Sequence, residues 1–226
     1  MEPNVPTLVS TYRANPTAGF SIVTYEGTNT ADQSFAHGLN TAPGFILIKN
    51  RDTNYAWAVW HKNLALGKYL ILNSSGAISD APQFNDQYPD SNVVYVGSSG
   101  ATNFESHVAY CWSEVEGYSK FGTYTGNGNT TDGPFCYCGF RPRYVITKGE
   151  DANDWFIRDT ARSPYNVIDN PLRQDTGSEY SGREADILSN GFKLRAANNW
   201  NQVNTDGVKY HWAAFAESPF KYSNAR

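Results

Sequence analysis

The sequence has few cysteines, a single methionine, no cluster of basic residues and no long hydrophobic run. Three cysteines provide no disulfide framework. A net charge of −4 without a basic cluster argues against a nucleic-acid-binding surface. The absence of any run of about 18 apolar residues predicts no membrane span. Cys136 and Cys138 stand two apart in a strand-like segment, where we expect small buried thiols; the alternative is a Cys-x-Cys half of a metal site.

Motifs of catalysis and of secretion are also missing. We find neither a Gly-x-Ser-x-Gly nucleophile elbow nor a phosphate-binding glycine loop. The four histidines, His37, His61, His107 and His211, are scattered and do not show the clustered spacing of a metal site. The first residues lack the basic and apolar regions of a signal peptide, so we expect synthesis in the cytoplasm. The sequence therefore predicts a protein that is not an enzyme and needs no cofactor or metal.

Aromatic residues are abundant, with 15 Tyr, 12 Phe and 6 Trp. They fall in short strand-like runs separated by turn residues, a pattern typical of β-sandwiches and barrels. We therefore predict an all-β, sandwich-like fold with little helix, the best helix candidate covering residues 179–188. Four aromatic residues in strand-like runs are predicted to anchor the core: Trp57, Trp112, Trp155 and Phe215.

Two blocks of the sequence recur with the same offset of 99 residues (124 − 25 and 148 − 49). Thr24-Tyr25-Glu26-Gly27 returns as Thr123-Tyr124-Thr125-Gly126, and the run 43–49 returns as 142–148. Such a long period indicates a duplicated half-domain rather than a solenoid. We predict two related halves, residues 19–117 and 118–226. No Gly/Ser-rich or Pro-rich linker separates them, which favours one compact unit over two domains.

A further series of motifs resembles a domain of uncharacterised function found mainly in virion and tail-fibre-like proteins of tailed bacteriophages, many of them marine. The series begins with residues 116–128 and 132–135. It continues with Gly139-Phe140-Arg141-Pro142 and with residues 159–166, 188–193 and 216–222. The resemblance covers residues 19–226. It implies a virion protein without established chemistry.

Residues 1–18 precede the repeats, contain three prolines and show no period, so we predict an extended N-terminal arm. This arm is too short to build a core of its own. We expect it to order against a neighbouring subunit or another virion protein. The candidate assembly residues of the arm are Pro3, Val5, Pro6, Leu8 and Tyr12.

Recognition is expected on loops, where binding residues concentrate. Trp200 lies in a polar loop, so its indole could stack on a sugar ring while neighbouring amides bind hydroxyl groups; the alternative is a local plug. The charged segment 171–183 is the second candidate. The predicted recognition residues are Asn198, Asn199, Trp200, Asn201, Arg173, Glu179 and Arg183.

Three functions follow from these expectations. The first is a homo-oligomeric tail-fibre or appendage module that recognises a host-surface glycan or protein. The second is a capsid decoration or tail-assembly subunit that binds other virion proteins. The third is a polysaccharide depolymerase, for which no motif is present.

Overall fold

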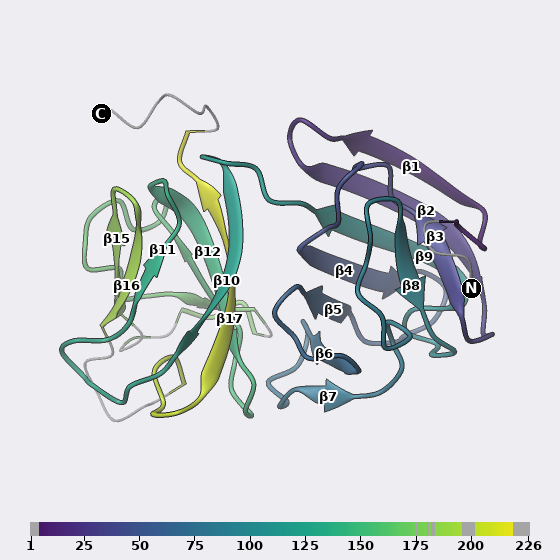
Figure 1. Ribbon diagram of the computed structural model, residues 1–226. Coiled ribbons are helices and arrows are strands. Elements are labelled where there is room, and N and C mark those ends of the chain that lie inside the picture. Colours follow the sequence, from purple (N-terminus) through teal and green to yellow (C-terminus); the bar gives the residue numbers. More distant parts are fainter. Residues whose placement is uncertain (1–4, 175, 180, 182–183, 196–201, 219–226) are drawn as a thin grey trace. The chain divides into compact units, whose positions relative to one another are not determined.

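The computed structural model describes residues 5–174, 176–179, 181, 184–195 and 202–218, and these residues form strands, turns and loops without any helix (Figure 1). The all-β prediction is confirmed. The helix predicted over residues 179–188 is wrong, because Glu184–Leu188 is a strand that pairs with Gly191–Arg195 in a hairpin. Within this described part, no helix has the length and apolar character needed to cross a membrane.

The chain divides into two compact units. Unit 1 comprises residues 1–73 and 78–115, and unit 2 comprises residues 74–77 and 116–226. The boundary after Val115 lies two residues before the predicted one. Each unit has its own cluster of buried apolar side chains. The preference for a single compact unit remains a prediction.

Unit 1 contains a seven-stranded antiparallel sheet and a two-stranded one. The order in the large sheet is β1-β2-β9-β4-β5-β6-β7, and β3 pairs with β8 in the small sheet. The strands are β1 (Ser10–Asn15), β2 (Phe20–Thr28), β3 (Gln33–Ala36), β4 (Phe45–Asn50), β5 (Ala58–His61), β6 (Lys68–Ile71), β7 (Ser79–Asp80), β8 (Val93–Val96) and β9 (Phe104–Trp112).

Unit 2 contains a five-stranded and a three-stranded antiparallel sheet. Their orders are β10-β17-β12-β13-β14 and β11-β16-β15. The strands are β10 (Ser119–Thr125), β11 (Phe135–Tyr137), β12 (Pro142–Gly149), β13 (Phe156–Asp159), β14 (Leu172–Arg173), β15 (Glu184–Leu188), β16 (Gly191–Arg195) and β17 (Lys209–Ala216).

The core of each unit lies on one face of its large sheet, because side chains alternate between the two faces of a strand. In β9, Ala109 and Cys111 join the buried cluster of unit 1, together with Phe35 of β3 and Val94 of β8. In unit 2 the corresponding cluster contains side chains of the large sheet together with Cys136 of β11, Phe192 of β16 and Ile187 of β15. Each core is therefore closed by the small sheet of the same unit.

The two units pair their strands in matching registers. Tyr25 of β2 stands opposite His107, and Tyr124 of β10 stands opposite Tyr210. Phe45 of β4 stands between His61 and Trp112; Tyr144 of β12 stands between Asp159 and Phe215. Tyr25 and Tyr124, and likewise Phe45 and Tyr144, are 99 residues apart, the offset of the sequence blocks. We call residues in the same register corresponding residues.

The N-terminal arm packs on its own unit. The backbone amides of Thr7 and Leu8 donate to the Ser34 carbonyl at 3.0 and 2.9 Å, and Leu8 is buried in the core of unit 1. Residues 10–15 form β1 on the edge of β2. The expectation that the arm needs another subunit in order to pack is therefore wrong for residues 7–15, because a free strand edge within the same unit supplies partners. Pro3 lies outside the described residues, while Val5, Pro6 and Tyr12 are exposed.

Candidate functional site

Three of the four predicted core anchors are only half-buried, and the fourth, Trp155, is buried as predicted. Trp112 and Phe215 are half-buried, because the core residues next to them, Cys111 and Ala214, point to the opposite face of the strand. Trp57 is also half-buried, and Trp60 takes part in the core of unit 1 instead.

Trp155 is buried, with 2% of its surface exposed, but lies outside the main cluster of unit 2. The tryptophan within that cluster is Trp212. The strand-like pattern thus identified the segments that contain these aromatic residues. It did not identify which face of a strand is buried, because a shift of one residue exchanges the two faces.

The histidine and cysteine side chains that the sequence analysis considered are dispersed. The Nε2 atom of His37 lies 3.2 Å from the carbonyl of Asp90, and that of His211 lies 2.8 Å from Oε1 of Glu150. Burial lowers the pKa of His211 to about 4. All three cysteines are free and buried, and burial raises the pKa of each thiol. The described residues contain no group of three His, Cys, Asp or Glu side chains that could hold a metal ion.

The predicted recognition loops are placed only in part. Asn198, Asn199, Trp200, Asn201 and Arg183 lie outside the described residues. Arg173 donates to Oδ1 of the buried Asp154 at 2.8 Å. Glu179 is exposed and pairs with Arg162 at 3.3 Å. Arg173 therefore ties β14 to the turn before β13, a role within the fold.

A groove of about 540 Å³ lies in unit 1 where the arm leaves the large sheet. β1 accompanies β2 only as far as the pair of Ser10 with Tyr25. Further toward the N-terminus, the arm bonds to Ser34 of β3 instead. The stretch 26–28 of β2 therefore has no β1 partner, and the groove opens beside it. We call this hollow the arm groove.

The arm groove is lined largely by polar side chains. Its walls carry four threonines and three larger polar residues; these are Thr7, Thr11, Thr24, Thr28, Glu26, Gln33 and Arg51. Leu8, Val9, Tyr25 and His107 complete the lining. Its volume falls within the range of about 300–1,000 Å³ that is typical of small-molecule sites. The surface that the groove exposes is nevertheless more apolar than polar, and the hydroxyls of Thr7 and Thr28 are already bonded within the unit.

Several groove side chains are held in place by neighbours. Ser106 donates to Oε1 of Glu26 at 2.9 Å, and Asn103 donates to Oε1 of Gln33 at 3.2 Å. The amide of Ser106 also donates to Asp52, and this bond lowers the pKa of that carboxyl. Among the described residues, no carboxylate lies within 4.0 Å of the exposed Arg51 guanidinium. Burial lowers the pKa of His107, so this side chain is neutral near pH 7.

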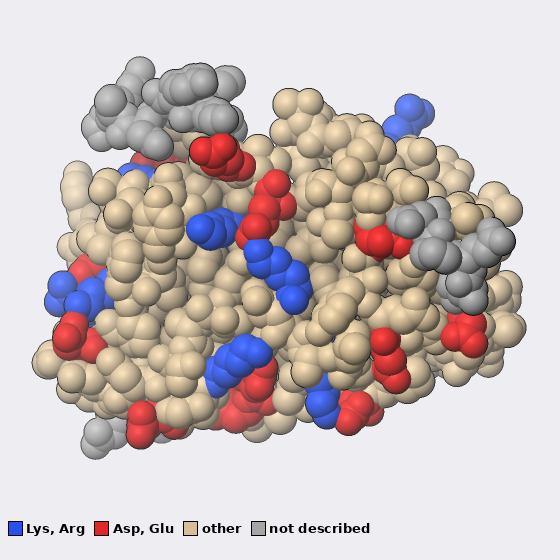
Figure 2. Space-filling view, in the orientation of Figure 1, with Lys and Arg blue, Asp and Glu red and all other residues tan. Residues whose placement is uncertain are grey.

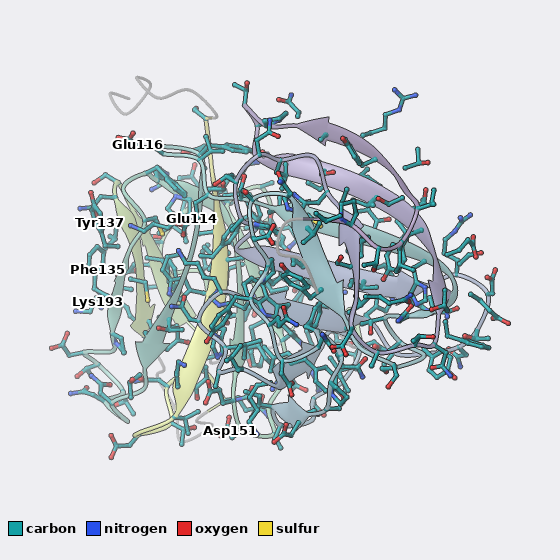
Figure 3. All side chains as sticks on the ribbon, turned by 45° about the vertical axis from the view of Figure 1, so that its right-hand side comes forward. Glu114, Glu116, Phe135, Tyr137, Asp151 and Lys193 are labelled. Carbon is teal, nitrogen blue, oxygen red and sulfur yellow. The ribbon has the colours of Figure 1, made fainter. Side chains whose placement is uncertain are left out.

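A second surface stands on β11 of unit 2. Phe135 and Tyr137 point to the outer side of the strand and are 47% and 57% exposed, with Lys193 of β16 next to them (Figure 3). The Nζ atom of Lys120 lies 4.9 Å from the centre of the Tyr137 ring, within cation–π distance. On the face drawn in Figure 2, basic and acidic residues are interspersed without a wide area of one sign.

Two asparagines that the sequence analysis did not single out occupy matching places in the two units. Asn103 accepts from the amide of Thr28 at 2.9 Å and donates to the carbonyl of Thr30 at 2.7 Å. Asn204 accepts from the amide of Asn127 and donates to the carbonyl of Asn129, both at 2.9 Å. The signal in the sequence was weak, since each asparagine is a single residue between unrelated neighbours. Both side chains organise the loop after a corresponding strand, β2 in unit 1 and β10 in unit 2.

The chain matches the family described as a domain of unknown function (DUF7483) over residues 4–219. It belongs to this family. The match runs through both units, so the family is defined by the pair and not by either unit alone. Neither a curated protein nor a solved structure matches the chain.

Proposed function

We propose that this DUF7483 protein is a structural protein of a tailed bacteriophage virion, a homo-oligomeric tail-fibre or appendage module that binds a host-surface glycan in the arm groove without catalysing a reaction. The motif series at residues 116–128, 139–142 and 216–222 supports the virion assignment by its resemblance to tail-fibre-like proteins. The observation that carries the binding role is the group of polar residues in the wall of the arm groove, Arg51, Glu26 and Thr24 among them.

A glycan fits this lining because sugars present many hydroxyl groups that both donate and accept hydrogen bonds. The hydroxyls of Thr11 and Thr24 can do the same, while Glu26 only accepts and Arg51 only donates. The guanidinium of Arg51 is suited to a carboxylate or phosphate substituent on the sugar, since it presents parallel N–H donors. The loop 198–201 remains a second candidate contact on the basis of its sequence.

Binding to an array of purified bacterial surface polysaccharides tests this function. Arg51→Ala should raise the dissociation constant for a bound polysaccharide at least ten-fold, which corresponds to about 1.4 kcal/mol. Thr24→Val should raise the dissociation constant by a smaller factor, because one hydroxyl is lost while the shape of the side chain is kept. Arg143→Ala is the matched control, since Arg143 is exposed on β12 of unit 2.

Two results would contradict the proposal. If no polysaccharide binds, or if Arg51→Ala binds as the wild type does, the arm groove is not a glycan site. Release of reducing sugar from a bound polysaccharide by the pure protein would show that it is a depolymerase and not a binding module.

We also propose that the two units arose by duplication of one ancestral domain. The matching strand order of β2-β9-β4-β5-β6 and β10-β17-β12-β13-β14 supports this origin. So do two lysines 99 residues apart: Nζ of Lys49 donates to the carbonyl of Asn50 at 2.7 Å, and Nζ of Lys148 donates to that of Gly149 at 2.8 Å. Because one family match spans both units, the duplication would precede the divergence of the family. Family members in which one unit has a different strand order would argue against it.

A further inference from the structure

In unit 1 the arm covers the outer edges of two strands. It pairs with β2 from Ser10 to Asn15. It also reaches β3, where the Ser34 amide donates to Oγ1 of Thr7 at 2.8 Å and the Ala36 amide donates to Oγ of Ser10 at 3.1 Å. One extended segment thus bonds with both edges on that side of the unit.

The corresponding strands of unit 2 are β10 and β11. Both are outermost strands of their sheets. Cys136 of β11 is buried like Phe35 of β3, and each strand is followed by a glycine with positive φ, 81° at Gly139 and 71° at Gly38. By this register, Phe135 corresponds to Ser34 and Tyr137 corresponds to Ala36.

The outer edge of β11 has no strand partner among the described residues. Leu194 donates to the carbonyl of Pro134, and Cys138 donates to that of Asn190. Backbone groups alternate in direction along an antiparallel pair, so those of Phe135 and Tyr137 point away from β16. These are the positions at which the arm bonds to β3 in unit 1.

In unit 2 a large side chain covers only part of the surface that corresponds to the one under the arm in unit 1. In unit 1 the ring of Tyr12 lies against Gly38, where an added Cβ would come within 2.3 Å of the ring. In unit 2 the nearest atom to an added Cβ at Gly139 is the hydroxyl of Tyr137, at 3.5 Å. The Tyr137 side chain thus stands over the glycine, yet more than half of it stays exposed.

We infer that the side of unit 2 bounded by β11 and β10 docks an extended polypeptide segment of a partner protein, which adds to the edge of β11 as the arm does to β3. Strand addition of this kind gains affinity from main-chain hydrogen bonds and specificity from side-chain contacts. The segment should carry small hydroxyl residues at the positions of Thr7 and Ser10. It should also carry an acidic residue for Lys120, which has no carboxylate partner among the described residues.

The chain does not supply this segment from the residues that precede β10. In unit 1 the arm precedes β2 and is free to turn back along it. In unit 2 the stretch before β10 is only residues 113–118, which connect directly from β9. This inference does not depend on the glycan proposal, because the arm groove belongs to unit 1.

A synthetic peptide with the sequence of residues 5–15 is the probe, because this segment pairs with the corresponding edges of unit 1. We expect the labelled peptide to bind the full-length protein in fluorescence anisotropy and to slow hydrogen exchange at the Phe135 and Tyr137 amides. Tyr137→Pro should weaken binding at least ten-fold, because it removes an outward N–H at an edge position where proline is tolerated. Tyr165→Ala is the control, since it removes another exposed tyrosine of unit 2.

Hydrogen exchange keeps the test decisive even if Tyr137→Pro does not fold, since it uses the wild-type chain. The inference is wrong if the peptide leaves the Phe135 and Tyr137 amides unprotected, or if it protects only Ser34 and Ala36 by displacing the arm. Protection of Phe135 and Tyr137 by self-association, without peptide, would identify a second copy as the occupant and overturn the partner inference. Polysaccharide binding that is lost in Tyr137→Ala would show a sugar platform instead.

Discussion

In unit 1 a strand of the arm lies outside β2, whereas in unit 2 the corresponding strand β10 is the outermost of its sheet. The two small sheets differ in the same way. Ser34 of β3 is bonded to the arm, and Phe135 of β11 extends into solvent. Two units with the same sheet order can therefore have this side either covered by the arm, as in unit 1, or open, as in unit 2. The open side of unit 2 presents the exposed aromatic side chains of Phe135 and Tyr137.

The cores of the units also differ by a compensating exchange. Trp60 of β5 and Ala109 of β9 in unit 1 correspond to Arg158 of β13 and Trp212 of β17 in unit 2. The large indole thus lies on opposite sides of the central strand, on β5 beside β4 in unit 1 and on β17 beside β12 in unit 2. Arg158 is fully buried and donates to Oγ1 of Thr147 at 3.2 Å, where unit 1 has Ile48. Side chains thus differ in size and polarity between the units at positions where the strand registers match.

The largest expected effect comes from removing the tryptophan of each core. Trp60→Ala and Trp212→Ala should each lower the free energy of unfolding by about 3–5 kcal/mol, since both indoles are buried in the main clusters. Trp57→Ala should cost roughly half as much, because Trp57 is half-buried. Denaturant unfolding followed by circular dichroism measures all three. Equal losses for Trp57 and Trp60 would show that Trp57, which precedes β5, contributes as much stability as the buried Trp60.

The next effect concerns the matching asparagines. Asn103→Ala and Asn204→Ala should each cost about 1–3 kcal/mol, because both asparagine side chains are buried and each provides hydrogen bonds to loop backbone groups. Hydrogen exchange should show faster opening of residues 27–30 in the first variant and 126–129 in the second. Asn54→Ala, at an exposed position, is the control. If only one of the two variants lost stability, the two asparagines would differ in their contribution to stability although their hydrogen bonds match.

The smallest effect distinguishes the units by pH. His211 of unit 2 corresponds to Val108 of unit 1, and burial lowers the pKa of His211 to about 4. The unfolded chain binds this proton near pH 6.5 and the folded chain does not, so stability falls as the pH drops from 6.5 toward 4. The lowered pKa of Glu150 acts in the same direction.

The expected share of His211 is about 2 kcal/mol between pH 7 and pH 5. His211→Gln should remove this contribution to the pH dependence of stability. The contributions of His37 and His107 in unit 1, whose pKa values are also lowered, should remain. Melting temperatures of both proteins across this range measure the difference. An unchanged slope would mean that the pKa of His211 is the same in the folded and the unfolded chain.

Much of the strand pattern was predictable, because turn residues and β-branched or aromatic runs act locally. The recurring blocks 43–49 and 142–148 cover most of β4 and β12. The helix over residues 179–188 was wrong because its apolar spacing also suits a strand, and pairing with β16 decided between them. The arm groove was not predictable, since its walls come from segments far apart in the chain.

The sequence by itself determined the all-β class and the recurrence of two similar strand sets, because both rest on residue type and spacing along the chain. Only the tertiary structure decided which face of each strand is buried, where the arm lies and which edges stay open. Those properties depend on the register between distant strands, and a shift of one residue moves every side chain to the other face. Phe135 and Phe35 are both aromatic residues in short strands, yet one lies in solvent and the other in a core.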